Sequence, residues 1–134
     1  MTVYIAASWK HEHLVELVTR LLEARGHRVK SFVREAAHRE PTGFDLVPSL
    51  DKWINSPDGA RKFQFDSSSA ETCDAVIYLG PSGADAWAEI GIAFGAGNKN
   101  IFGLTAKGES IGLMRRMVKW CTTVDELLDA VGKP

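Results

Sequence analysis

The sequence predicts an α/β protein built on a doubly wound parallel sheet of about five strands. Short apolar segments rich in β-forming residues alternate along the chain with segments that carry apolar residues at helical spacing. The first strand–helix–strand unit takes about thirty residues, which suits two parallel strands joined by a right-handed crossover. From this alternation we expect a Rossmann-like sheet with the strand order 2-1-3-4-5.

The first strand–helix–strand unit lies near the beginning of the chain. Thr2–Ala7 is an apolar run that is expected to be a buried strand, and Arg28–Val33 alternates as a second strand does. Between them, residues 10–25 are expected to form a helix that ends at Gly26, where a left-handed C-cap is favoured. The apolar stripe of this helix consists of Leu14, Leu17, Val18, Leu21 and Leu22.

The remaining elements follow from turn residues and caps. Prolines and glycine interrupt residues 34–56, and a short amphipathic helix is expected within residues 44–54. Ser56 is expected to cap a helix that runs from Pro57 to Thr72. Further strands are expected at Asp74–Leu79, Asn100–Leu104 and Met117–Cys121, and further helices at Ala84–Ala96 and after a capping box of Thr123 and Glu126.

The composition excludes several classes of function. The chain has 134 residues and a formal net charge of −1, with both signs interspersed, which argues against a nucleic-acid polymer or a membrane surface as partner. Cys73 and Cys121 show neither metal-ligand nor disulfide spacing, so we expect a reducing compartment, the cytoplasm. We also expect no metal and no cofactor. Neither a signal peptide nor a run of the ~20 apolar residues that cross a membrane is expected. We expect residues 1–134 to form one domain.

The expected strand order places a ligand crevice between the carboxyl ends of strands 1 and 3. Ser82 and Gly83 lie in a tight turn after strand 3, where the first N–H groups of a helix form an anion site. Ser82 either caps this helix or offers its hydroxyl to a ligand, and the two roles can coexist. Tyr4 and Ser8 bracket the end of strand 1 on the other side of the crevice.

Glu89 is the most informative residue of this region. It lies in a helix whose other residues are mostly small or apolar, so its carboxylate either points to solvent or faces the crevice. A half-buried glutamate at an anion-binding crevice is suited to act as a base or a nucleophile. For Asp66, exposure on a helix is the usual explanation, and for each of the four tryptophans packing is the default, although one or two can stack on a base.

Several segments carry a more specific pattern. They are Tyr4–Ser8, Asp66 followed by Cys73–Tyr78, Ser82–Ala93 and Gly97–Ile101. Together these segments resemble the nucleoside 2-deoxyribosyltransferase family, which includes the deoxynucleoside 5′-monophosphate N-glycosidases. The resemblance spans residues 3–104 and is strongest at the strand, turn and helix that contain Glu-x-Gly-x-Ala.

The resemblance implies a role for each matching residue. Glu89 matches the glutamate that attacks, or assists attack at, the sugar C1′. Asp66 matches an aspartate that contacts the nucleobase and helps to protonate it. Ser82 is the nearest match to a serine that binds the sugar or phosphate, and Tyr4 and Ser8 match residues that line the pocket.

The segment before Glu89 departs from the family pattern. The family usually carries an acidic residue and a small polar step there, whereas this chain has Ala86, Trp87 and Ala88. Trp87 either fills ligand space or stacks on the ligand. The resemblance and the apolar segment 44–54 both imply a homodimer or a higher homo-oligomer.

We therefore expect cleavage or transfer at the N-glycosidic bond of a (deoxy)nucleoside or its 5′-monophosphate, with a small-molecule nucleoside or nucleotide as the partner. One alternative is a non-catalytic nucleotide-binding module of the same fold. Another is a domain similar to Toll/interleukin-receptor domains, which also uses a helix glutamate, on NAD.

Overall fold

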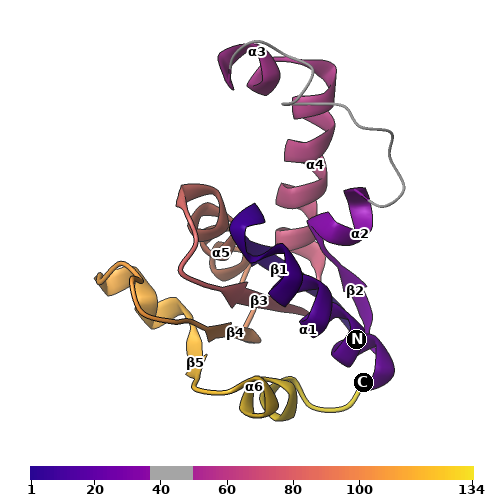
Figure 1. Cartoon of the computed structure of the whole chain (residues 1–134), viewed down its shortest axis with the longest axis vertical. Coiled ribbons are helices and arrows are strands. Elements are labelled where there is room, and N and C mark those ends of the chain that lie inside the picture. Colours follow the sequence, from indigo (N-terminus) through magenta and orange to yellow (C-terminus); the bar gives the residue numbers. More distant parts are fainter. Residues whose placement is uncertain (37–49) are drawn as a thin grey trace.

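A five-stranded, all-parallel sheet in the order β2-β1-β3-β4-β5 forms the centre of the molecule, which confirms the predicted fold class and strand order (Figure 1). The structure is a computed structural model that describes residues 1–36 and 50–134. The strands are β1 (Thr2–Ala7), β2 (Arg28–Lys30), β3 (Ala75–Leu79), β4 (Ile101–Leu104) and β5 (Lys119–Cys121).

The helices lie on both faces of the sheet. They are α1 (Glu12–Ala24), α2 (Phe32–Ala36), α3 (Leu50–Ile54), α4 (Pro57–Thr72), α5 (Ala84–Gly95) and α6 (Val124–Val131), with 3₁₀ turns η1 (Trp9–His11) and η3 (Leu113–Met117). None of the described helices is both long enough and apolar enough to cross a bilayer.

Two apolar layers hold the helices to the sheet. On one face, Val3, Ile5 and Ile77 pack against α1 and α6. On the other face, Tyr4 and Tyr78 pack against α4 and α5. Alternate residues of a strand point to opposite faces, so this division follows directly from the sequence. It places both tyrosines under the two helices that carry Asp66 and Glu89.

The helix α4 extends past the sheet, and the short helix α3 packs at its far end (Figure 1). Its N-cap is Ser56, whose Oγ accepts the N–H of Gly59 at 3.1 Å, as the sequence predicts. Since α4 leads into β3 and runs back along it, its first turns lie at the end of the sheet where β1 and β3 finish.

The second strand is shorter than expected, and its prediction through Val33 is wrong. β2 ends at Lys30, and Phe32 begins α2. Ser31 explains the break, because its Oγ accepts the N–H of Arg34 and its carbonyl accepts the N–H of Glu35, so it caps a helix.

Two further differences concern the middle and the end of the chain. The helix expected within 44–54 is described only from residue 50, because residues 44–49 lie outside the described part. In the capping box, Thr123 accepts the N–H of Glu126 as expected, but the Glu126 carboxylate accepts from Thr122 rather than from Thr123.

Replacement of Gly103 in β4 by alanine should destabilise the sheet. An added Cβ would lie 2.5 Å from Val118 Cγ1 and 3.0 Å from Trp120, and overpacking of this kind costs about 1–3 kcal/mol. Gly95→Ala is the matched control, because a Cβ there meets nothing within 4 Å. The control should keep or raise the stability by up to about 1 kcal/mol. Urea denaturation measures both changes, and equal stability of the two variants would contradict the packing at β4.

Candidate active site

The ends of β1 and β3 are joined by a pair of serines. The N–H of Ser8 donates to Ser82 Oγ at 2.9 Å, and Ser82 Oγ donates to the carbonyl of Leu79 at 2.6 Å. Of the two alternatives for Ser82, capping of α5 is wrong, because the N-cap is Gly83, which makes no side-chain capping bond. Ser82 is turned toward the strand ends because its hydroxyl satisfies two backbone groups there.

Gly83 leaves the start of α5 open. No atom lies within 4 Å of where a Cβ would be at this position, and no side chain caps the first turn. Asp85 is the acidic residue of that turn, where a carboxylate suits the helix dipole. The backbone at Gly83 is thus exposed at the carboxyl end of β3.

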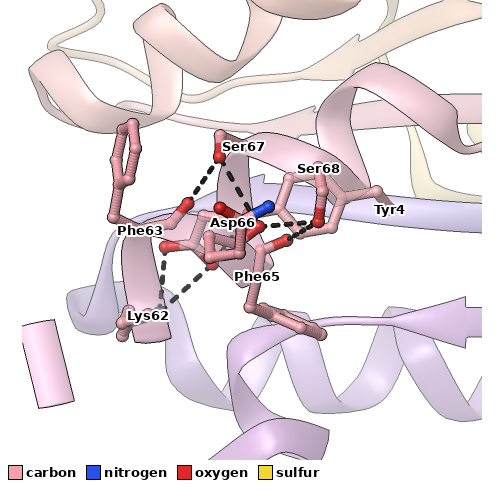
Figure 2. A network of polar contacts seen from close by, with 8 residues as sticks. Tyr4, Lys62, Phe63, Phe65, Asp66, Ser67 and Ser68 are labelled. Atoms are coloured by element: carbon pink, nitrogen blue, oxygen red, sulfur yellow. Dashed lines mark hydrogen bonds and ion pairs between the residues drawn. The ribbon is translucent and has the colours of Figure 1, made fainter. Parts of the chain in front are cut away.

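Three side chains meet between the sheet and the helices α4 and α5: Tyr4 of β1, Asp66 of α4 and Glu89 of α5. We call these three residues the Tyr4 cluster. The Tyr4 hydroxyl donates to Asp66 Oδ1 at 3.2 Å and also interacts by hydrogen bonding with Glu89. Tyr4 is buried, Glu89 is 9% exposed, and Asp66 is half-buried. Figure 2 shows the Asp66 carboxylate between Tyr4 and Lys62.

Burial of Glu89 raises the pKa of its carboxyl from the ordinary 4.5 to about 8. The charge of Asp66 adds to this rise, and that of Asp85 adds less, whereas the hydrogen bond with Tyr4 and the charge of Lys62 lower the pKa. Burial also raises the pKa of the Tyr4 phenol, so that Tyr4 stays protonated. At neutral pH the protonated form of Glu89 is therefore favoured.

Tyr4 has a single hydroxyl proton to share between two carboxylates. When Glu89 is protonated, it can donate to the Tyr4 oxygen while Tyr4 donates to Asp66. When Glu89 is ionised, both carboxylates compete for the same proton. The Tyr4 cluster is therefore an acid–base unit in which the protonation of Glu89 and the hydrogen bonding of Asp66 are coupled.

Trp87 lies in a different part of the site. Its ring packs against Tyr78, with centroids 4.7 Å apart, and against Trp120 at 6.2 Å. Its Nε1 donates to Glu109 at 3.4 Å, and Glu109 also accepts from the Tyr78 hydroxyl at 2.5 Å. Trp87 is thus part of an aromatic cluster over β3 and β5, and its contact with a ligand stays a prediction.

Lys62 and Glu109 are the polar residues of this region that the sequence analysis did not single out. Lys62 precedes Asp66 by four residues, and this spacing on one helix is the signal that indicates an ion pair. Its Nζ lies 3.1 Å and 3.3 Å from the two Asp66 carboxylate oxygens. No local sequence pattern indicates the contacts of Glu109, because its partners Tyr78 and Trp87 are distant in the sequence.

A groove of about 470 Å³ lies between α5 and η3. It is mostly apolar and its walls include Trp87, Gly91 and Leu113, but not the residues of the Tyr4 cluster. Since Trp87 and Gly91 each lie two positions from Glu89, they occupy the opposite side of α5. The groove and the carboxylates are therefore separate features of the molecule.

Solved structures of other proteins are similar to this chain, whereas no protein-family model and no curated protein sequence matches it. The CMP N-glycosidase of Clostridium botulinum superposes with a TM-score of 0.61 at 21% identity, covering 96% of this chain and 95% of that one. The 2-deoxyribosyltransferase of Bacillus psychrosaccharolyticus superposes with a TM-score of 0.66 at 21% identity, covering 100% and 93%. The chain therefore has the fold that its resemblance to nucleoside 2-deoxyribosyltransferases predicts.

Proposed function

We propose that this chain cleaves or transfers the N-glycosidic bond of a nucleoside or a nucleoside 5′-monophosphate. The observation that carries the proposal is the Tyr4 cluster, in which two carboxylates are held around one buried hydroxyl at the edge of the predicted crevice. The structural neighbours support it, because one is a CMP N-glycosidase and the other a 2-deoxyribosyltransferase.

Glu89 is the proposed nucleophile or charge-stabilising group at C1′. Departure of the base gives C1′ oxocarbenium character, and a carboxylate close to C1′ either stabilises that charge or forms a glycosyl-enzyme. Only the ionised form of Glu89 can do this. Asp66 is the proposed contact to the nucleobase and helps to bring a proton to the departing base. Water as the second reactant gives hydrolysis, and a second base gives transfer.

The strand ends are proposed to bind the rest of the substrate. Ser82 and the open backbone of Gly83 lie after β3, at the strand end where a sugar hydroxyl or a 5′-phosphate is expected to bind. Ser8 holds Ser82 in place through its N–H. Trp87 supports this wall through Tyr78, whose hydroxyl accepts the N–H of Ser82 at 2.9 Å.

A non-catalytic nucleotide-binding module is the second candidate. The observation that favours it is the raised pKa of Glu89, because a mostly protonated carboxyl at neutral pH is a poor nucleophile. The two functions differ in whether free base is produced, so one assay distinguishes them. The same assay with NAD addresses the Toll/interleukin-receptor-like alternative.

Glu89→Gln should abolish release of free base from a panel of deoxynucleosides, nucleosides and their 5′-monophosphates. The amide keeps the size of the side chain but removes the charge that C1′ needs, so a loss of at least about 100-fold is expected. Chromatography of the products measures it, and Glu71→Gln, an exposed position on α4, is the control. If the wild type releases no base from any compound and Glu89→Gln binds nucleotides as the wild type does, the binding module is the better function.

The same variant should also be more stable than the wild type above about pH 5. The folded pKa of Glu89 lies above the unfolded one, so the wild type loses stability as the pH rises from 4.5 toward 8 and the difference then levels off. At pH 7 the variant should gain up to roughly 3 kcal/mol. Urea denaturation between pH 5 and 9 tests this. A stability difference that does not change with pH would show that Glu89 is not buried in the way described.

We further propose a homodimer. Ile111, Leu113 and Met114 are exposed by 98%, 81% and 65% next to the apolar groove, a surface that a second copy would cover. Light scattering at micromolar concentration should give twice the chain mass, and Leu113→Asp should reduce it to a single chain mass with a folded circular dichroism spectrum. A monomeric wild type would disprove this part of the proposal.

A further inference from the structure

Lys62 occupies a restrained position next to the Tyr4 cluster. Its ammonium group contacts both carboxylate oxygens of Asp66, at 3.1 Å and 3.3 Å, and lies 5.9 Å from the ring centroid of Phe32 (Figure 2). The side chains of Lys62 and Asp66 are only 23% and 21% exposed. An exposed lysine and aspartate at this helical spacing contribute a few tenths of a kcal/mol and have no fixed geometry. This pair is instead half-buried and held against a second element.

The two carboxylates of the Tyr4 cluster share one hydroxyl donor, and Lys62 offers a second donor to one of them, Asp66. Asp66 and Glu89 both interact with the Tyr4 hydroxyl, which supplies one proton. If Asp66 depended on Tyr4 alone, that proton would remain with Asp66, and an ionised Glu89 would be buried without a donor. Two contacts from Lys62 satisfy Asp66 independently. The Tyr4 proton is then available to Glu89 when Glu89 ionises.

Three elements contribute the titratable and charged groups that act on Glu89. β1 contributes Tyr4, α4 contributes Asp66 and Lys62, and α5 itself contributes Asp85. The remaining polar groups nearby have other partners, since Tyr78 of β3 bonds Ser82 and Glu109, and Arg115 of η3 lies 4.0 Å from the ring of Trp120. Among these described groups, Lys62 is the cation that acts on Glu89.

We propose that Lys62 is a positioning residue of the active site, which holds the Asp66 carboxylate and releases the Tyr4 hydroxyl proton to Glu89. This rests on the proposed function, in which Glu89 acts at C1′ in its ionised form. Lys62 does not touch the reacting bond. It determines what fraction of the protein carries Glu89 in that form, and it does so by donating to both carboxylate oxygens of Asp66, including Oδ1, which also accepts from Tyr4.

The first test is independent of activity. Glutamate carboxyl groups are labelled with ¹³C, the Glu89 signal is assigned with Glu89→Gln, and its titration is followed by NMR in the wild type, Lys62→Met, Lys62→Gln and Lys62→Arg. Loss of the cation should move the Glu89 midpoint upward by about one pH unit in the Met and Gln variants. The Arg variant should titrate within a few tenths of a unit of the wild type, since it keeps the charge and a two-pronged contact.

Arg61→Met is the matched control for this titration. It removes the same charge from the neighbouring position of α4, where Arg61 forms a surface pair with Asp58 and its side chain is 60% exposed. The Glu89 midpoint should not move in this variant. An equal shift in Arg61→Met and Lys62→Met would overturn the proposal, because it would show a general effect of net charge. An unchanged midpoint in both Lys62→Met and Lys62→Gln would overturn it as well.

The second test uses the pH dependence of base release. With a Glu89 midpoint near 8, a shift of one unit should lower kcat/KM of Lys62→Met about tenfold at pH 7, and the loss should shrink as the pH rises. A merely structural role would lower kcat/KM by a constant factor at every pH, and that outcome would contradict the proposal. Absence of base release by the wild type would overturn the proposed function, while the NMR titration still decides the role of Lys62.

Discussion

The parallel pairing of β1 with β3 is the constraint on which the candidate site depends. The register sets Tyr4 opposite Val76 and Ala6 opposite Tyr78, so both tyrosines point to the face covered by α4 and α5. A shift of one residue would turn Tyr4 into the layer beneath α1 and α6. The strands are buried on both faces, so the apolar residues on either side fix this register. The position of the Tyr4 hydroxyl is thus set by the core of the protein.

The helices bring charge to that hydroxyl at a cost in stability. Asp66 and Glu89 lie on α4 and α5 facing each other, and burial makes ionisation of Glu89 unfavourable. A protein under selection for stability alone would favour an apolar residue at such a position. Buried carboxylates with a strongly raised pKa are instead concentrated at functional sites. This argument supports a functional role for Glu89 independently of any likeness to other proteins.

The sequence was sufficient to predict the features that depend on local pattern. Alternation and helical spacing predicted the strand order and the helix that carries Glu89, and Ser56 and Thr123 marked helix starts correctly. The prediction that β2 runs to Val33 is wrong because Ser31 caps α2, whose first residue, Phe32, is buried. Contacts between distant segments, such as Glu109 with Trp87, have no local signal and require the structure.

Trp87 shows how such a distant contact changes the interpretation of a residue. Its bulk next to Glu89 suggested that it either fills or lines ligand space. In the structure the helix turns Trp87 away from Glu89, and Glu109 holds its indole N–H. Because Glu109 also accepts from Tyr78, and Tyr78 accepts from the N–H of Ser82, the indole supports the turn at the end of β3. The bulk of Trp87 therefore packs against Tyr78 and Trp120 and does not lie beside the Glu89 carboxylate.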